Sequence, residues 1–299
     1  MRETILQLER EGRLAEAERQ AVAWVAAEPN LPEARNMLAL ARLRLGRPTE
    51  AMQTLEPVMA GAEDNPALQV SYGRAALLAG DRMRASLAFE KARRRDPNGV
   101  EAYIGLASVA LYTGDLQAAE SGFRTALRAD DEAVEAWLGW GQTLAIKGDM
   151  AAATRCFTTA LELHPEDLRA QVSMGHSLRV QGYPDFAVQA FENVLNKAPD
   201  FAYARLLLAE TEMERNRTEA AEKAFSTLRD HPEYGVAARV GLAELALRRG
   251  DLNSAVPWFE QVLAREPALE RALLGLLECL DRLGQRGRAR ELLSAWLAQ

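Results

Sequence analysis

Three short segments carry residue types that do chemistry in enzymes and metal sites, but none has the spacing that the chemistry needs. Gly175-His176-Ser177 resembles the G-x-S-x-G turn that exposes a nucleophilic serine, yet Arg179 stands where the closing glycine is required. The surrounding periodicity also places this serine inside a helix. His164 and His231 are too far from His176 along the chain to share a metal ion with it. We therefore predict no catalytic residue, no metal site and no cofactor.

One position recurs along the whole chain at an interval of 34 residues, and we call it the anchor. Glycine and asparagine are the residue types that most readily adopt the left-handed backbone that closes a helix. The anchor is glycine in eight copies and asparagine in one. The nine anchors are Gly12, Gly46, Gly80, Gly114, Gly148, Gly182, Asn216, Gly250 and Gly284.

The same pattern surrounds each anchor. Small and apolar residues precede it at helical spacing, and a helix-capping residue often follows it, as in Lys147-Gly148-Asp149. Alanine comes five residues after every anchor, and proline often ends the second half of the period, where it stops a helix. Each period therefore predicts two antiparallel helices joined by a tight turn. Nine residues after the anchor, six copies carry phenylalanine: Phe89, Phe123, Phe157, Phe191, Phe225 and Phe259.

This pattern resembles the tetratricopeptide repeat, W-x2-L-G-x2-Y followed by A-x3-F and P. One copy reads Trp137-x2-Trp140-Gly141-x2-Leu144, then Ala153-x3-Phe157 and Pro165, and the resemblance covers essentially the whole chain. It implies an all-α fold: a right-handed α-solenoid superhelix of about nine antiparallel helix pairs, the first truncated, forming a single domain over 1–299. The expected units are 1–31, 32–65, 66–98, 99–131, 132–165, 166–199, 200–232, 233–267 and 268–299.

Three places depart from the repeat. Pro57 lies inside the second helix of its unit, so we expect that helix to be kinked or short. Asp131 replaces the closing proline, which predicts a less sharply broken junction. The last helix is apolar where terminal repeats normally need a polar outer face. Either its surface pairs with another subunit or partner, or it turns inward; its apolar residues are Leu292, Leu293, Trp296 and Leu297.

Composition argues against several functional classes. A net charge of −7 offers no basic domain face to neutralise phosphates, so we expect no nucleic-acid partner. Cys156 and Cys279 lie in different repeats, so we expect no disulfide between them. The charged N-terminal segment and the absence of a long apolar stretch predict no signal peptide and no membrane insertion. We expect a cytoplasmic protein, and the 32 arginines against 4 lysines suggest a bacterial, GC-rich source.

In the family fold, the first-helix positions ten, six, three and two residues before the anchor face away from the packing side and line a concave groove. The position ten before the anchor is aliphatic in seven units, and small residues stand beside it. We predict an apolar stripe open to a ligand; the alternative is that these residues pack onto neighbouring first helices. The stripe comprises Val70, Ile104, Leu138, Val172, Leu206, Val240 and Leu274, and the small neighbours are Ser71, Gly105, Gly139, Ser173, Gly241 and Gly275.

Polarity changes along the same face. The position six before the anchor runs from Arg74 to His176 and then to Glu210, Glu244 and Glu278. A ligand whose basic end lies toward the last repeats is one hypothesis, and a solvated acidic surface is the alternative. The candidate partner-binding residues are Val70, Arg74, Ile104, Ser108, Tyr112, Leu138, Gln142, Val172, His176, Leu206, Glu210, Val240 and Glu244.

These features predict a non-enzymatic scaffold or adaptor that binds a protein or peptide segment in the groove. Two alternatives stay open at this stage. The chain could instead be the substrate-docking or regulatory subunit of an enzyme system that modifies proteins or envelope polymers. It could also be a structural scaffold that self-associates through its terminal helices.

Overall fold

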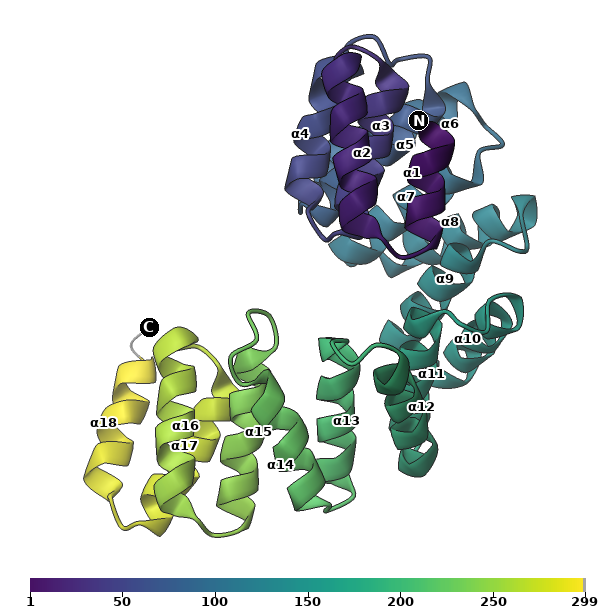
Figure 1. Cartoon of the computed structure of the whole chain (residues 1–299). Coiled ribbons are helices and arrows are strands. Elements are labelled where there is room, and N and C mark those ends of the chain that lie inside the picture. Colours follow the sequence, from purple (N-terminus) through teal and green to yellow (C-terminus); the bar gives the residue numbers. More distant parts are fainter. Residues whose placement is uncertain (298–299) are drawn as a thin grey trace. The chain divides into compact units, whose positions relative to one another are not determined.

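The computed structural model describes residues 1–297, and every regular element within them is an α-helix (Figure 1). Contacts divide the chain into two compact units, Met1–Pro165 and Glu166–Gln299. Within each unit, consecutive helices pack in pairs, and the second helix of one pair packs on the first helix of the next. The expected all-α solenoid of helix pairs is confirmed. A single continuous domain over 1–299 stays a prediction.

The unit Met1–Pro165 contains five helix pairs. Its first helices are α1 (Arg2–Arg10), α3 (Pro32–Arg44), α5 (Pro66–Leu78), α7 (Val100–Thr113) and α9 (Val134–Ile146). Its second helices are α2 (Leu14–Ala27), α4 (Pro48–Met59), α6 (Arg82–Arg95), α8 (Leu116–Ala129) and α10 (Met150–Leu163). Neighbouring first helices also touch one another, from α1 on α3 to α7 on α9, so they form a continuous layer.

The unit Glu166–Gln299 contains four pairs within its described residues. Its first helices are α11 (Leu168–Val180), α13 (Ala202–Glu214), α15 (Gly235–Arg248) and α17 (Glu270–Arg282). Its second helices are α12 (Pro184–Lys197), α14 (Thr218–Leu228), α16 (Leu252–Arg265) and α18 (Arg286–Leu297). The order of packing is the same as in the first unit.

All nine anchors have the left-handed backbone that their residue types predict. Their φ angles run from +57° at Asn216 to +87° at Gly148. The residue after each anchor donates its backbone N–H to the carbonyl five residues earlier, as Asp149 does to Leu144 at 3.0 Å. This is the Schellman closure. Asp149 also accepts the N–H of Ala152 at 3.0 Å and so caps the following helix.

The phenylalanine nine residues after the anchor is the centre of six helix pairs, from α5–α6 to α15–α16, and the pair α3–α4 has Leu55 in its place. All six are at most 2 % exposed. Phe89 lies against Gly73 of its own pair and Gly105 of the next pair; a Cβ on these glycines would come within 2.8 Å and 2.3 Å of the ring. Phe123 lies against Gly139 in the same way, at 2.2 Å. The four glycines beside the predicted stripe therefore make room for these rings and are not open to a ligand: Gly105, Gly139, Gly241 and Gly275.

Side-chain donors at the start of the first helices hold the turns between pairs. The donor stands eleven residues before the anchor and reaches the carbonyl oxygen six residues before itself. Its residue type varies, because only an N–H or O–H group is needed. The bonds run from Arg35 to Pro29 (2.6 Å), from Tyr103 to Pro97 (2.9 Å), from Trp137 to Asp131 (2.7 Å) and from Arg205 to Pro199.

Two of the expected local departures can now be decided. The junction at Asp131 is as sharp as the others, since α8 ends at Ala129 and α9 begins at Val134, so that expectation was wrong. The carbonyl of Asp131 still accepts the Trp137 bond, and it needs no proline ring to do so. The helix that contains Pro57 is short, as predicted: α4 has 12 residues, whereas α6 has 14.

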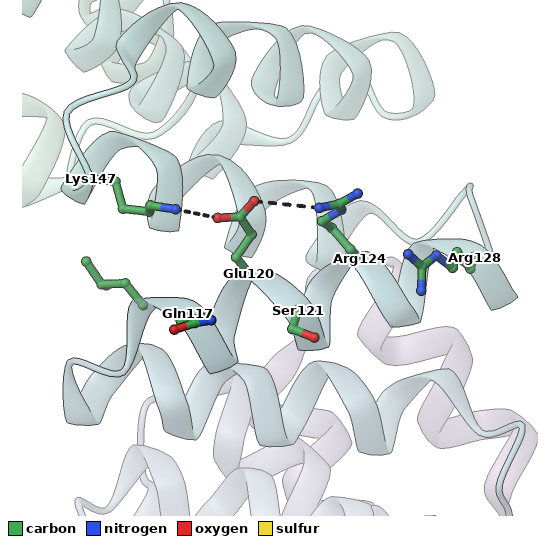
Figure 2. Close-up of a pocket in the computed structure, with 7 residues that line it drawn as sticks. Gln117, Glu120, Ser121, Arg124, Arg128 and Lys147 are labelled. Atoms are coloured by element: carbon green, nitrogen blue, oxygen red, sulfur yellow. Dashed lines mark hydrogen bonds and ion pairs between the residues drawn. The ribbon is translucent and has the colours of Figure 1, made fainter.

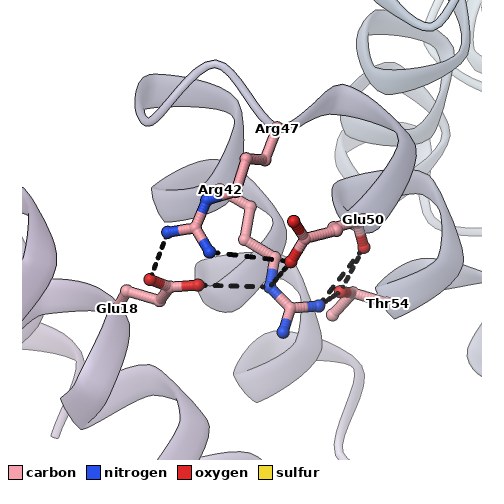
Figure 3. A network of polar contacts seen from close by, with 5 residues as sticks. All are labelled: Glu18, Arg42, Arg47, Glu50 and Thr54. Atoms are coloured by element: carbon pink, nitrogen blue, oxygen red, sulfur yellow. Dashed lines mark hydrogen bonds and ion pairs between the residues drawn. The ribbon is translucent and has the colours of Figure 1, made fainter.

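A polar network joins α2, α3 and α4 (Figure 3). Glu18, whose side chain is 15 % exposed, accepts from Arg47 at 2.5 Å and from Arg42 at 3.5 Å. Arg42 also donates to the hydroxyl of Thr54 at 2.5 Å, and both arginines lie within 3.8 Å of Glu50. Two cations face two carboxylates, so the charges are balanced within the fold. The network holds three helices together and leaves no free charge for a ligand.

We predict that Gly139→Ala lowers the free energy of unfolding by about 1–3 kcal/mol, because its methyl group would overlap the ring of Phe123. Chemical denaturation monitored by circular dichroism measures the change. Gly61→Ala is the matched control, since a Cβ there meets nothing within 4 Å. A second change, Phe123→Leu, is expected to recover part of the loss in Gly139→Ala. Equal stability of the Gly139 and Gly61 variants would contradict the packing account.

Candidate partner-binding surface

The aliphatic residues ten before the anchor are mostly inside the protein. Leu138, Val172, Leu206 and Val240 are at most 7 % exposed, and Val70 and Ile104 are half-buried against core clusters. In the seven-residue series, only Leu274 is exposed. The prediction of an open apolar stripe was therefore wrong, and its alternative holds: these residues pack between neighbouring pairs.

The physical reason lies in the distance between neighbouring first helices. Val172 belongs to a core cluster with Ala204 of α13, and Val240 to one with Ala272 of α17. Adjacent first helices are close enough to cover this position from the side. A helical wheel of one helix gives the direction of a side chain but not what the next helix covers.

Three exposed apolar residues of the first unit stand two residues before the anchor, at the C-terminal ends of α5, α7 and α9. Leu78, Tyr112 and Ile146 are 59 %, 58 % and 63 % exposed, and we call them the apolar row. Two residues correspond to about 200° on a helix, so this position lies opposite the packing position four before the anchor. Tyr112 was among the predicted residues, whereas Leu78 and Ile146 were missed. Their identical place in the 34-residue period was the signal.

Polar residues lie one helical turn before the apolar row. Arg74 precedes Leu78 on α5, Ser108 precedes Tyr112 on α7, and Gln142 precedes Ile146 on α9. Arg74 and Gln142 are exposed, and Ser108 is half-buried with its hydroxyl bonded to the carbonyl of Ile104 at 2.8 Å. Three neighbouring helices thus present the same order, polar and then apolar.

In the second unit, the predicted acidic series is paired with arginines. Glu210 lies 3.1 Å from Arg179, and Glu244 accepts two bonds from Arg271 at 2.6 Å and 2.7 Å. The hydrogen bonds that Arg271 donates to Glu244 raise the pKa of Arg271 above its usual value. These carboxylates already have counter-ions within the fold. A basic partner would have to displace them, so this face offers less free negative charge than the sequence suggests.

His176 lies among these charges in α11 and is half-buried. Burial, followed by the Arg179 cation, lowers the pKa of His176 below its usual 6.5. Ser177 is 1 % exposed, and Gly175 lies against Phe191, as repeat packing predicts. The segment is inside a helix, and it does not present a serine to a substrate.

The remaining chemistry-bearing residues can be placed as well. Cys156 and Cys279 are free and buried, and burial raises the pKa of the Cys156 thiol to about 11. Such a thiol is a poor nucleophile. Within residues 1–297, no cluster of three or more His, Cys, Asp or Glu side chains could hold a metal ion. Among the same residues, no helix has both the length and the apolar content needed to cross a bilayer.

The terminal helix α18 turns only part of its apolar surface inward, and pairing of the rest with another subunit or partner stays a prediction. Leu292 is half-buried against the core of the preceding pair, and Trp296 is half-buried too. Leu293 and Leu297 are 40 % and 70 % exposed. One side of the helix therefore packs inward and the other carries apolar side chains at the surface.

The repeat geometry described above agrees with a family comparison. Two models described as tetratricopeptide repeat match the chain, one at residues 6–62, 72–122, 104–167 and 213–270, and the other at 178–233 and 246–299. The chain belongs to the tetratricopeptide repeat family. A comparison with curated proteins gave no match.

Solved tetratricopeptide structures share the fold. The Cut9–Hcn1 structure from the APC/C has a TM-score of 0.80 at 16 % identity, over 93 % of this chain and 55 % of that one, so the chain spans little more than half of that relative. Pseudomonas aeruginosa PilF has a TM-score of 0.60 at 19 % identity, over 71 % of this chain and 96 % of that one. A human IFIT1 variant with capped RNA has a TM-score of 0.67 at 17 % identity, over 98 % and 79 %. At these identities the likeness shows the fold alone.

We predict that acidification destabilises the unit Glu166–Gln299 partly through His176. Because its pKa is lowered in the folded state, the unfolded chain binds a proton below pH 6.5 that the folded chain does not. This contribution to stability is complete above pH 6.5 and is lost as the pH falls. His176→Gln is therefore expected to reduce the difference in unfolding free energy between about pH 7.5 and 5.5. Exposed His164, replaced in the same way, is the control; an unchanged difference in the His176 variant would contradict the assignment.

Proposed function

We propose that the protein is a non-enzymatic interaction scaffold that binds a protein or peptide segment on the first-helix face of Met1–Pro165. The apolar row carries the proposal: Leu78, Tyr112 and Ile146 are each more than half exposed at one repeat position on neighbouring helices. Large apolar side chains that recur at one surface position are typical of a binding surface. Membership of the tetratricopeptide repeat family supports this reading, since the family fold implies a groove along the first helices.

The row suits a ligand with apolar side chains repeated along its length. Covering each of the three residues would contribute roughly 1.5–3 kcal/mol before the cost of ordering the ligand, which is about 2–5 kcal/mol. The exposed cation of Arg74, for which no ion pair is found among the described residues, favours a carboxylate beside the apolar anchors. The expected ligand is therefore an apolar segment with an acidic residue near the α5 end of the row.

A capture experiment tests this proposal. Partners retained from a lysate by the wild-type protein are identified by mass spectrometry, and their binding is then measured for a Tyr112→Glu, Ile146→Glu variant. We expect affinity to fall at least tenfold, because two apolar contacts are replaced by charges. Leu138 of the predicted stripe is unsuitable for such a variant, since it is only 5 % exposed and its replacement would disturb folding.

The chain offers a matched control on a second helix of the same unit. Met83 and Leu87 of α6 are 84 % and 58 % exposed, so Met83→Glu with Leu87→Glu changes charge and apolarity equally on a different surface. This variant is expected to bind like the wild type. If both variants retain the partner, or if both lose it equally, the first-helix face is not the binding site.

Self-association is a second candidate, favoured by the exposure of Leu293 and Leu297 on α18. Light scattering over a range of concentrations separates a self-associating scaffold from a monomeric adaptor. If α18 mediates association, Leu297→Glu shifts the protein toward the monomer. A molecular mass that does not depend on concentration in the wild type would exclude this candidate.

A further inference from the structure

A pocket of about 590 Å³ lies along the second helix α8. Figure 2 shows the side chains that line it, which come from α8 and from Lys147 at the end of α9. Most are polar or charged: Gln117, Glu120, Ser121, Arg124, Arg128 and Lys147. Three cations thus face a single carboxylate in the pocket.

The carboxylate is shared and cannot neutralise the pocket. Glu120 lies 2.6 Å from the Nζ of Lys147 and 3.9 Å from a guanidinium nitrogen of Arg124. Arg124 is also held over the ring of Trp140, 5.8 Å from its centroid. Arg128, one turn further along α8, is exposed, and no ion pair is found for it among the described residues. The residues that line the pocket therefore carry two more positive charges than negative ones, and one of the cations, Arg124, is held in place over Trp140.

Among the second helices α4, α6, α8 and α10, only α8 has an arginine at both of two positions, ten and fourteen residues after the anchor. Ten and fourteen residues after the anchor, α8 has Arg124 and Arg128. At the same two positions, α4 and its C-cap have Glu56 and Ala60, α6 has Glu90 and Arg94, and α10 has Thr158 and Glu162. The repeat pattern does not require cations here, because the other pairs fold without them. The charge on α8 is thus available for a role beyond packing.

We propose that the α8 pocket binds an acidic, extended segment of a partner protein through Arg124, Arg128 and Lys147. Two residues one helical turn apart are separated by about 6 Å along the helix axis. Alternate side chains of an extended chain are separated by about 6.6 Å, so carboxylates at every second position would meet successive cations. Gln117 and Ser121, on the adjoining turns of α8, offer hydrogen bonds to the backbone of such a segment. The pocket adjoins the surface of the proposed function at Lys147, which follows Ile146, so variants on α8 test the pocket without changing the apolar row.

A protein segment fits the charges of the chain better than a nucleic acid. The protein carries a net charge of −7, which repels a long polyanion at a distance, whereas a short acidic segment meets mainly the local excess of cations. Binding of the segment is expected to weaken with added salt, because the cations are exposed.

The test uses the full chain and a fluorescein-labelled octapeptide of alternating glutamate and serine, with binding followed by fluorescence anisotropy. Arg124→Gln with Arg128→Gln is expected to weaken binding roughly three- to thirtyfold. The matched control is Arg82→Gln with Arg94→Gln, which removes two exposed cations of α6 outside the pocket and should leave affinity unchanged. Equal losses in the two variants would show a diffuse charge effect and overturn the proposal.

Glu120→Gln provides a test of opposite sign, which a folding defect could not imitate. Removing the shared carboxylate frees Lys147 and Arg124, so the octapeptide should bind roughly three- to tenfold more tightly. Weaker or unchanged binding would overturn the proposal. So would tighter binding of an oligothymidylate of equal charge, which would assign the pocket to nucleic acid, or equal binding of an octapeptide with lysine in place of glutamate.

Discussion

The fit of a phenylalanine ring between small residues is the constraint on which most of the interior helix pairs depend. The ring of Phe89 fills the space left by Gly73 on one side and Gly105 on the other, and no side-chain atom could be added at either glycine without displacing it. This contact sets how closely the first helix of one pair approaches the second helix, and how closely the next pair follows. The turns and caps orient the helices, but the ring fixes their separation.

Because neighbouring first helices lie close together, fewer of their side chains are exposed to a partner than the helical wheel of one isolated helix indicates. Side chains ten before the anchor, such as Leu138, become part of the core, and those two before it, such as Tyr112, stay at the surface. The apolar row lies on first helices and most of the pocket lies on the second helix α8; the two surfaces differ in chemistry, one apolar and the other cationic. A repeat scaffold can in this way present two unlike surfaces without changing its packing.

The fold could be predicted from the sequence to the extent that residue type determines backbone geometry. Left-handed anchors require glycine or asparagine, and Asp149 is a typical cap, so their spacing identified every helix pair. The donors eleven before the anchor escaped prediction, since Arg35, Tyr103 and Trp137 share a hydrogen-bonding group but not a hydrophobicity class. The exposed surface could not be predicted for another reason. Burial of the residue ten before the anchor depends on the neighbouring first helix, which a helical wheel of one helix leaves out. Likewise, the ion pair between Glu244 and Arg271 joins residues 27 apart in sequence.

The ring contact also bears on how such a chain changes its length over generations. Two successive rings meet a small residue on both sides: Phe89 lies between Gly73 and Gly105, and Phe123 lies between Ala107 and Gly139. If the period from Gly80 to Gly114 were duplicated in the gene, both copies of the ring would again meet a small residue on each side. An insertion within α7 would instead replace Gly105 at the ring by a larger neighbour, such as Ile104 or Leu106. The packing thus favours the gain or loss of whole 34-residue periods over shifts within a helix, and it keeps the copies in phase without any demand from the ligand.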